Sequence, residues 1–153
     1  LGGLITTGYA YVDELRYEAA APPVAETYAQ GCYFASSLGA SGLPWLGDTI
    51  SLGVTAVGSA LPVLMAIGAS NQQWAGVPLP LPLGTFGFPN CELVVAPDVV
   101  LAATTTGTMA SLSLAIPSQP LLLGARLHVQ AFEPSLQGTG TGSNGLLLQL
   151  GGR

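Results

Sequence analysis

The sequence lacks lysine and has few charged residues of any kind. Asp, Glu, Lys and Arg make up 7 % of the 153 residues, against about 25 % in a typical soluble domain. The basic residues are Arg16, Arg126 and Arg153, and the net charge is −5. A chain with so little positive charge cannot neutralise a phosphate backbone, so we expect it to bind no nucleic acid. Binding to an anionic membrane surface is disfavoured for the same reason.

Histidine is equally scarce, which removes the side chain most often used in acid–base catalysis. His128 is the only histidine, and no G-x-S-x-G nucleophile motif is present. Asp13 and Glu14 are adjacent, so in a strand they point to opposite faces and cannot act as a pair. Four other carboxylates are isolated from one another in the sequence and lack the spacing of metal ligands. They are Asp48, Glu92, Asp98 and Glu133. We therefore expect no enzyme, no catalytic residue, no metal site and no cofactor.

A long hydrophobic helix is missing from the pattern as well. Ile50–Ala69 carries no charged residue, but glycines and the central Pro62 interrupt it, and no basic residues flank it. Membrane-spanning helices have the opposite features, so we expect no membrane span. The chain begins at Leu1 rather than Met, and we expect either a processed protein or a fragment.

Short apolar runs separated by Gly, Pro, Ser and Asn fill most of the chain, a pattern typical of an all-β domain. We expect one β-sandwich, with jelly-roll-like or Greek-key connections, over residues 31–153. The expected strands are Tyr9–Tyr17, Thr49–Val57, Pro62–Ile67, Cys91–Ala96, Val99–Ala103, Thr108–Ile116, Arg126–Phe132 and Gly145–Leu150.

The expected strands differ in how they should face the core. In Arg126–Phe132 the alternation of apolar and polar residues predicts one inward and one solvent-facing side. The inward residues are Leu127, Val129 and Ala131, and the solvent-facing ones are Arg126, His128 and Gln130. The run Glu92–Ala103 is apolar on both faces, which requires cover from the second sheet and from something else. Gly140–Gly145 matches G-x-G-x-x-G without a following helix, so we expect a turn at Asn144–Gly145.

Residues 1–20 differ from the rest of the chain and are expected to form an N-terminal extension. They hold three of the five tyrosines and a local concentration of charge. If this segment is extended, one face carries Tyr9, Tyr11, Asp13, Leu15 and Tyr17, and the other carries Ala10, Val12, Glu14, Arg16 and Glu18. Residues 21–30, with Pro22–Pro23, are expected to be a stiff linker. A strand on a linker belongs either to its own sheet or to the sheet of a neighbouring molecule.

Prolines alternate in the segment VPLPLPLG, at Pro78, Pro80 and Pro82. In a strand, residues i, i+2 and i+4 direct their N–H groups to the same edge, so these prolines would block one edge and leave the other free. The other interpretation is a polyproline-like loop that lies over the core. With either interpretation, no sheet continues through this edge.

Serine and threonine must cover much of the surface, because charges are so few. Neutral hydroxyls are less costly to desolvate than charges, which favours contact with partner proteins. Thr104–Thr106, Thr139 and Thr141 could carry O-linked sugars, although no Asn-x-Ser/Thr sequon is present. Trp45 and Trp74 are expected to be buried loop anchors, or alternatively a stacking platform for a sugar ring.

Cys32 and Cys91 fit either one disulfide in a secreted protein or two free thiols in a cytosolic one. From Gly31 onward, the chain resembles a secreted, β-rich, jelly-roll-like domain of environmental Gram-negative bacteria. The motifs that carry this resemblance are, in order, GC, LPWLGDTISLGV, VLMAIGAS, FGFPNCEL, LAIPSQPLLLGARLHVQAF and SNGLLLQLG. The resemblance implies export, a Cys32–Cys91 bridge and a β-sandwich, with no catalytic residues.

Two functions fit these expectations. A sandwich preceded by a strand on a linker is similar in architecture to the subunits of extracellular bacterial filaments, which assemble by donor-strand complementation. In this hypothesis the partners are identical subunits, and the N-terminal strand enters a neighbour's sheet. The residues in contact would be Tyr9, Tyr11, Val12, Leu15 and Tyr17. In the alternative hypothesis the chain is a carbohydrate-binding or adhesive module of a larger secreted protein, tethered by an interdomain linker.

Overall fold

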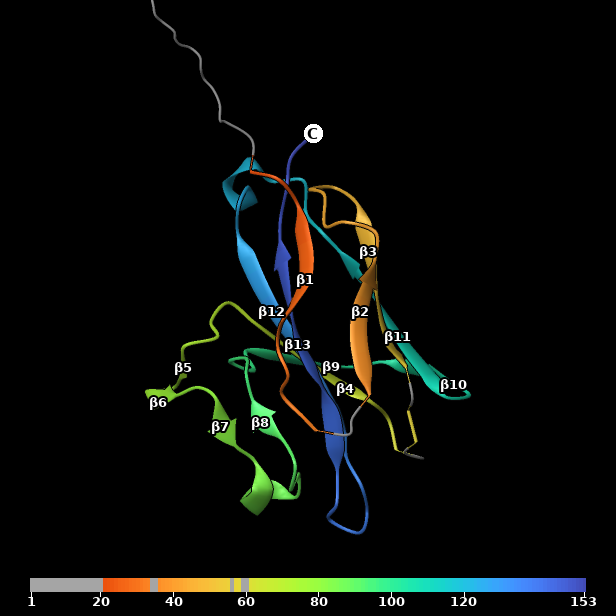
Figure 1. Ribbon diagram of the computed structural model, residues 1–153. Coiled ribbons are helices and arrows are strands. Elements are labelled where there is room, and N and C mark those ends of the chain that lie inside the picture. The colour runs from red at the N-terminus through yellow and green to blue at the C-terminus, as the bar shows by residue number, and fades with distance from the viewer. Residues whose placement is uncertain (1–20, 34–35, 56, 59–60) are drawn as a thin grey trace, which may run out of the picture.

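The computed structural model describes residues 21–33, 36–55, 57–58 and 61–153, which form an all-β sandwich (Figure 1). One antiparallel sheet has five strands in the order β1–β13–β12–β4–β9, and the facing sheet has four in the order β10–β11–β3–β2. The five are β1 (Val24–Ala29), β4 (Leu64–Gly68), β9 (Val99–Ala102), β12 (Arg126–Glu133) and β13 (Thr141–Gln149). The four are β2 (Ser37–Ser41), β3 (Thr49–Thr55), β10 (Thr104–Thr106) and β11 (Met109–Ala115). The fold class predicted from the sequence is therefore confirmed.

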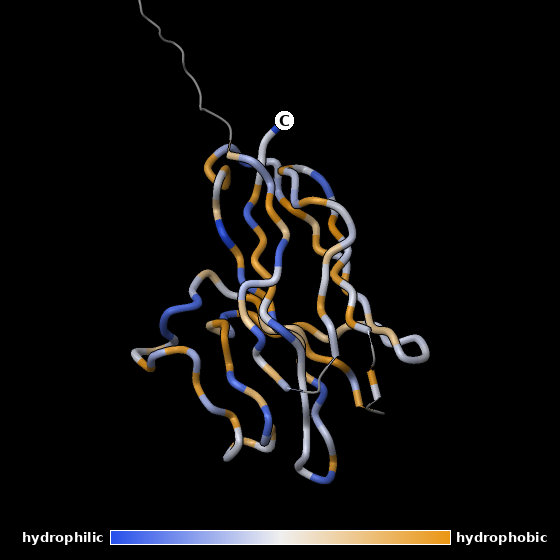
Figure 2. Tube along the Cα trace, viewed as in Figure 1, coloured by the Kyte–Doolittle hydropathy of each residue, from blue (hydrophilic) through white to orange (hydrophobic). Residues whose placement is uncertain are grey.

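The main core lies between the two sheets and takes alternate residues of strands such as β3, β11 and β12. In β3, Ile50, Leu52 and Val54 point inward and are at most 1 % exposed. They pack with Met65 of β4 and Leu148 of β13 from the facing sheet. Side chains two positions apart share one face of a strand, which is why apolar alternation predicts this core. Figure 2 shows the hydrophobic residues distributed along the strands of both sheets.

Residues 73–98 form a lobe that packs on the outer face of the five-stranded sheet (Figure 1). It contains the short strands β5 (Gln73–Trp74), β6 (Val77–Pro78), β7 (Leu81–Pro82) and β8 (Glu92–Leu93), with the 3-10 helix η1 (Gly84–Phe86). A disulfide between Cys32 and Cys91 ties the lobe to the segment after β1, which confirms the predicted bridge. Both half-cystines belong to a second hydrophobic cluster, where they pack with Val95 and Phe132.

The lobe buries two side chains that the alternation of β12 predicts to face solvent. His128 and Gln130 are 7 % and 0 % exposed, whereas Arg126 is exposed as predicted. The side-chain amide of Gln130 hydrogen-bonds to the lobe backbone as a neighbouring strand would. Its Oε1 accepts from the Val94 N–H (3.0 Å), and its Nε2 donates to the Glu92 carbonyl (2.9 Å). The prediction was wrong for these two residues because the outer side of the strand is covered by chain rather than by water.

His128 occupies a packed position next to the first strand. Its ring meets the edge of the Tyr28 ring at 5.1 Å between centroids, and its Nδ1 has no hydrogen-bond partner among the described residues. Burial lowers the pKa of His128, although backbone hydrogen bonds at Gly68 and Ala69 act in the opposite direction. The Tyr28 hydroxyl donates to a carbonyl of the lobe, and burial raises the pKa of Tyr28. The only histidine is therefore a packing residue, and its burial favours the neutral imidazole.

The sequence predicts a turn at Asn144–Gly145, but these residues lie inside β13. The Asn144 side chain bridges the two sheets, because it accepts from the Leu38 N–H (2.8 Å) and donates to the Leu38 carbonyl (3.0 Å). Gly145 sits under the Tyr28 ring, which leaves no room for a Cβ atom. The turn between β12 and β13 is instead at residues 134–140.

The sequence also predicts a linker over residues 21–30, but Val24–Ala29 is β1 and pairs with β13 at the sheet edge. Pro22 and Pro23 come just before the strand, where proline is tolerated. The predicted strand Cys91–Ala96 is shortened to β8, because the rest of it forms the buried cover over the sheet. The N-terminal extension and its predicted strand Tyr9–Tyr17 lie outside the described residues.

Candidate functional site

A hydrophobic groove lies between the lobe and part of the outer face of the five-stranded sheet. Its volume is about 330 Å³, and every residue that lines it is hydrophobic. The sheet contributes Leu64, Ala66, Val100 and Phe132, and the lobe contributes Trp74, Leu81 and Phe86, among others. The groove is continuous with the cluster around the disulfide, since Ala66 and Phe132 belong to both. The covalent bridge therefore holds the two walls of the groove together.

The rim of the groove exposes large hydrophobic side chains. Phe86 is 66 % exposed, Val100 52 % and Trp74 40 %. The sequence predicts that Trp74 is a buried anchor, but the tight β5–β6 pairing leaves its indole at the rim of the groove. Contiguous exposed apolar surface in a soluble protein marks an interaction site. The groove is thus suited to bind an apolar partner.

The groove ends at a free strand edge. β9 is the last strand of its sheet, and within the described part of the chain no strand pairs with its outer side. All four of its residues, Val99–Ala102, are exposed and uncharged. Proteins usually protect such an edge with charge, proline or a bulge, because its unpaired N–H and C=O groups can pair with another chain. β9 carries none of these protections within its four residues.

The alternating prolines lie in the lobe, where the chain bends between two short ladders. Pro78 ends β6, which pairs with β5, and Pro82 ends β7, which pairs with β8. Pro80 lies between these two ladders. The Leu79 N–H, between two of the prolines, donates to the Gln72 carbonyl (2.9 Å). The prolines therefore lie in the wall of the groove, and the segment is neither one continuous strand nor a loop throughout, because it takes part in two short ladders.

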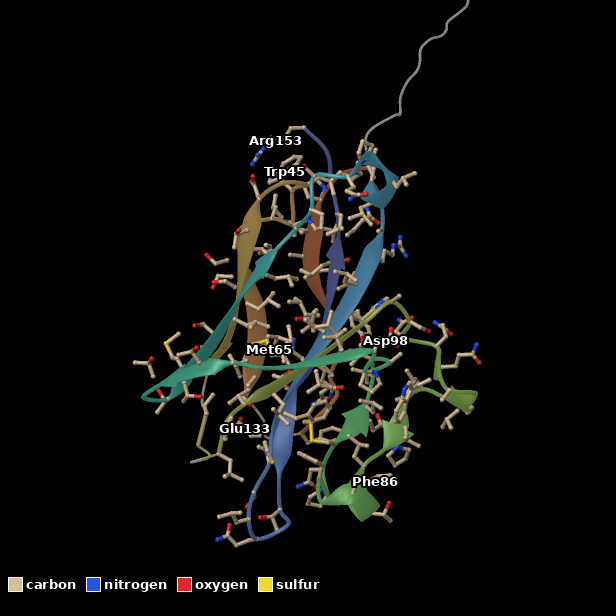
Figure 3. The ribbon with its side chains drawn as sticks, turned by 180° about the vertical axis from the view of Figure 1, so that it is seen from behind. Trp45, Met65, Phe86, Asp98, Glu133 and Arg153 are labelled. Carbon is tan, nitrogen blue, oxygen red and sulfur yellow. A yellow bond between two sulfur atoms is a disulfide. The ribbon has the colours of Figure 1, made fainter. Side chains whose placement is uncertain are left out.

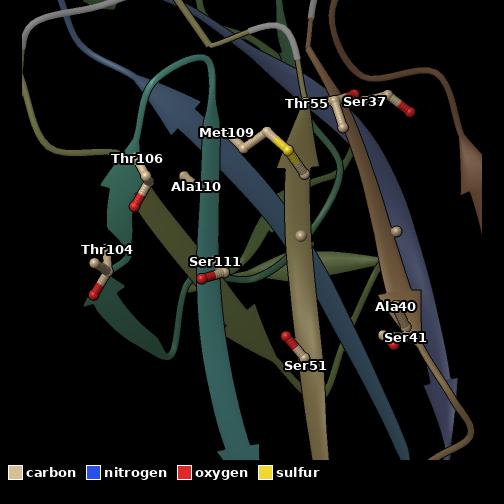
Figure 4. A pocket seen from close by; sticks show the side chains of 12 residues that line it. Ser37, Ala40, Ser41, Ser51, Thr55, Thr104, Thr106, Met109, Ala110 and Ser111 are labelled. Carbon is tan, nitrogen blue, oxygen red and sulfur yellow. The ribbon is translucent and has the colours of Figure 1, made fainter.

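The outer face of the four-stranded sheet has a second hollow of different chemistry (Figure 4). Its volume is about 470 Å³, and serine, threonine, glycine and alanine line it together with Met109. Gly39 of β2 pairs with Gly53 of β3 at its centre, so no side chain fills the middle. Thr104 and Thr106, which are among the predicted positions for O-linked sugars, lie at its side and are exposed. This face offers hydroxyl groups but no aromatic ring.

The other residues that the sequence singles out form no ligand site within the part of the chain that the structure describes. Trp45 is half-buried under the Arg153 guanidinium, 4.8 Å from the ring centroid, and Arg153 forms an ion pair with Asp48 (2.8 Å). Among the residues that the structure describes, no three His, Cys, Asp or Glu side chains gather where they could hold a metal ion. No helix in this same part of the chain is long and apolar enough to cross a membrane.

The described residues do not include the predicted assembly residues Tyr9, Tyr11, Val12, Leu15 and Tyr17. Sequence reasoning did not find the groove itself. A partial signal existed in the run Glu92–Ala103, which is apolar on both faces and contributes Leu93, Pro97 and Val100 to the groove. The rest of the lining comes from lobe segments too short for periodicity to detect.

Comparisons with protein-family models, with curated proteins and with solved structures find no match for this chain. The resemblance to a secreted bacterial domain therefore stays a prediction. The groove, the open edge of β9 and the composition of the chain are the observations that bear on function.

Proposed function

We propose that this protein is a structural subunit of an extracellular filament, in which each subunit binds residues 1–20 of its neighbour. The observation that carries this proposal is a wholly hydrophobic groove beside an unprotected strand edge. A site of this kind suits an extended, apolar peptide. Residues 1–12 of the chain carry no charge at all. The extension of each subunit thus has the chemistry that the groove of the next subunit requires.

The point where the described chain starts and the groove lie at opposite ends of the molecule. Pro23 packs against Gly151, so the described chain starts at the end that also holds the C-terminus. The lobe lies toward the other end, and Figure 3 shows Phe86 well away from Arg153. A donor at one end and an acceptor at the other produce head-to-tail contacts. Such contacts generate an open filament when the rotation between subunits does not close a ring.

The alternation of the extension suits a partner that is buried on one side. In an extended segment, Tyr9, Tyr11, Leu15 and Tyr17 share the face that would enter the groove, with Asp13 also on that face, and Val12 lies on the other face. Full burial of one large apolar side chain stabilises by about 1.5–3 kcal/mol. Main-chain hydrogen bonds to a sheet edge add affinity, and the alternate side chains fix the register. A few such side chains are therefore enough for stable association.

The alternative, a carbohydrate-binding or adhesive module, has less support. A sugar site combines an aromatic face with polar groups that orient the ligand. Trp74 stands among hydrophobic side chains only, and the ring of Trp45 is covered by Arg153. The hollow on the four-stranded sheet has hydroxyl groups without an aromatic ring. Secretion is common to both functions and is supported by the disulfide, because disulfides persist outside the reducing cytosol.

A mixing experiment tests the proposal. Deletion of residues 1–20 removes the donor and none of the described strands. Trp74→Arg with Phe86→Arg places two charges at the groove rim and keeps the donor. We expect filaments from the unmodified protein by electron microscopy, monomers from each variant by sedimentation, and a dimer that does not grow when the two variants are mixed.

The matched control is Leu136→Arg, because Leu136 is 85 % exposed and lies outside the groove lining. It should form filaments like the unmodified protein. Filaments from the deletion variant would overturn the proposal. An unmodified protein that remains a monomer at high concentration would favour the binding module.

A further inference from the structure

We infer that the acceptor in this assembly is the free edge of β9, and that Tyr9–Val12 of a second copy add to it as the next strand of the sheet. This inference rests on the proposed function and specifies its contact surface. The groove alone would accept any apolar side chains. The strand edge adds a main-chain pairing that requires an extended segment of matching length.

Hydrogen bonds identify which backbone groups of β9 are free. The Ala103 N–H donates to the Val63 carbonyl (2.8 Å), and the register between β4 and β9 continues directly from this pair. In an antiparallel ladder, every second residue bonds to the same neighbour, so Leu101 bonds to β4. The N–H and C=O groups of Val100 and Ala102 therefore point to the outer edge. Two residues with the same orientation provide a short ladder for one incoming strand.

The other edges of the two large sheets are less suited to strand addition. The outer side of β2 is closed by β13, whose Asn144 side chain bonds both the N–H and the C=O of Leu38. β1 has a register shift between Thr27 and Ala29, and it exposes the charge of Glu26. β10 is only three residues long, and all three are threonine. Of these four edges, β9 is the one that combines apolar side chains with a regular, uncharged backbone.

Tyr9–Val12 is the part of the extension that fits β9. It is uncharged on both faces, and charge begins at the next residue, Asp13. β9 likewise exposes apolar side chains on both faces. Val100 lines the groove, whereas Leu101, opposite Met65, faces the margin of the main core. In the added strand the two tyrosines would extend the groove side, and the alanine and valine would extend the core side.

Proline substitutions in the full-length protein test the edge separately from the groove. Ala102→Pro removes one outward N–H group and keeps the bonds to β4, as prolines on edge strands do. We expect the concentration needed for assembly to rise by about tenfold, the equivalent of one lost hydrogen bond. The control is Ala40→Pro on β2, where alternation from Leu38 also directs the N–H outward. Thermal unfolding of both variants reports whether they are folded.

The control should assemble like the unmodified protein. If Ala102→Pro is folded and assembles normally, the inference about β9 is wrong. Loss of filaments on deletion of residues 1–20 would still uphold the proposed function in that case. If the deletion variant also polymerises, the proposed function fails together with the inference.

Cysteine trapping gives a second test that does not depend on proline. The full-length protein with Tyr11→Cys and Val100→Cys should form covalent oligomers on oxidation, once the Cys32–Cys91 bridge is complete. The control pairs Tyr11→Cys with Met109→Cys, because Met109 is 54 % exposed, close to the 52 % of Val100, and lies on the other sheet. Covalent oligomers from the Val100 pair alone support the inference. None from that pair, or equal amounts from both pairs, would overturn it.

Discussion

The outer faces of the two sheets have opposite surroundings. On the five-stranded sheet, His128 and Gln130 point outward from β12, and the lobe buries them. On the four-stranded sheet, the outward-facing Gly39 and Gly53 lie in an open hollow among hydroxyl side chains. The side chains that the lobe covers and those in the open hollow are uncharged, but only the covered ones lie in an interior. A low content of charge therefore does not distinguish a covered face from a bare one.

Polar groups also have different roles on the two faces. A buried amide or backbone group must find a partner within the protein, whereas an exposed hydroxyl can bond to water. Gln130 meets this requirement through the backbone of Glu92 and Val94. Single substitutions should therefore lower stability strongly on the covered face and weakly on the open one. The following predictions test this contrast from the largest expected effect to the smallest.

Loss of the disulfide should have the largest effect on the covered face. Cys32→Ala with Cys91→Ala releases a chain segment with a separation of 59 residues, for which loop-closure entropy predicts a loss of about 4 kcal/mol. We expect the free energy of unfolding in urea, under oxidising conditions, to fall by about that amount. The control on the open face is Ser51→Ala with Ser111→Ala, which should change it by less than about 0.5 kcal/mol per site. A loss below about 1 kcal/mol without the bridge would show that packing alone holds the lobe.

Gln130→Leu should have the next largest effect. The substitution leaves the buried Val94 N–H and the partly buried Glu92 carbonyl without their Gln130 partner, and an unsatisfied buried group costs about 1–3 kcal/mol. We expect a loss of about 3 kcal/mol in the free energy of unfolding, measured with urea. Gln137→Leu, in the exposed turn between β12 and β13, is the matched control and should be nearly neutral. Equal effects at both positions would contradict the role of Gln130 as a bridge to the lobe.

The contrast between the faces also shows how far the sequence could predict the fold. Alternation in β12 correctly placed Val129 and Ala131 in the main core, because a period of two is a local property of a strand. It could not show that His128 and Gln130 are buried, because the chain that covers them comes from the lobe, far away in the sequence. The run Glu92–Ala103, apolar on both faces, predicted that some cover exists without identifying it.

The candidate site was harder to predict than the fold. Its lobe wall is built from strands of two residues, which are too short to show any periodicity. β1 follows Pro22–Pro23, which favour a linker, and β2 has the sequence SLGAS, which contains no apolar run. The open edge of β9 depends on strand order, which non-local pairing decides. Sequence patterns thus predict strands and their faces, whereas edges and grooves depend on the tertiary arrangement.

Two glycines provide a direct comparison of the faces. A Cβ atom on Gly68 would lie 1.7 Å from the Ala96 carbonyl oxygen of the lobe, whereas one on Gly53 would meet nothing within 4 Å. Gly68→Ala must displace the lobe backbone, and overpacking of this kind costs about 1–3 kcal/mol. Gly53→Ala should instead stabilise by about 0.5–1 kcal/mol, because alanine loses less conformational entropy in a strand. Thermal unfolding of the two variants measures both signs, and a stable Gly68→Ala protein would mean that the lobe can shift away from the sheet.

The smallest expected effect is the pH dependence that His128 contributes. Burial against Tyr28 lowers the pKa of His128 in the folded protein, whereas the unfolded chain has the ordinary value of about 6.5. Between these two pKa values the unfolded state binds more protons than the folded state, so stability rises with pH in this range. The contribution of His128 is therefore complete above pH 6.5 and is lost as the pH falls through its lowered pKa.

Thermal unfolding from pH 8 to pH 5 can isolate this contribution by comparison with His128→Gln, which cannot take up a proton. The other titrating groups are the same in both proteins, so their effects cancel in the difference. We expect the unmodified protein to lose stability relative to the variant on acidification below about pH 6.5. A relative gain on acidification would mean that the folded protein holds His128 in its charged form. The outer face of the five-stranded sheet would then stabilise a buried charge. The two faces would differ in polarity rather than in how much of the chain covers them.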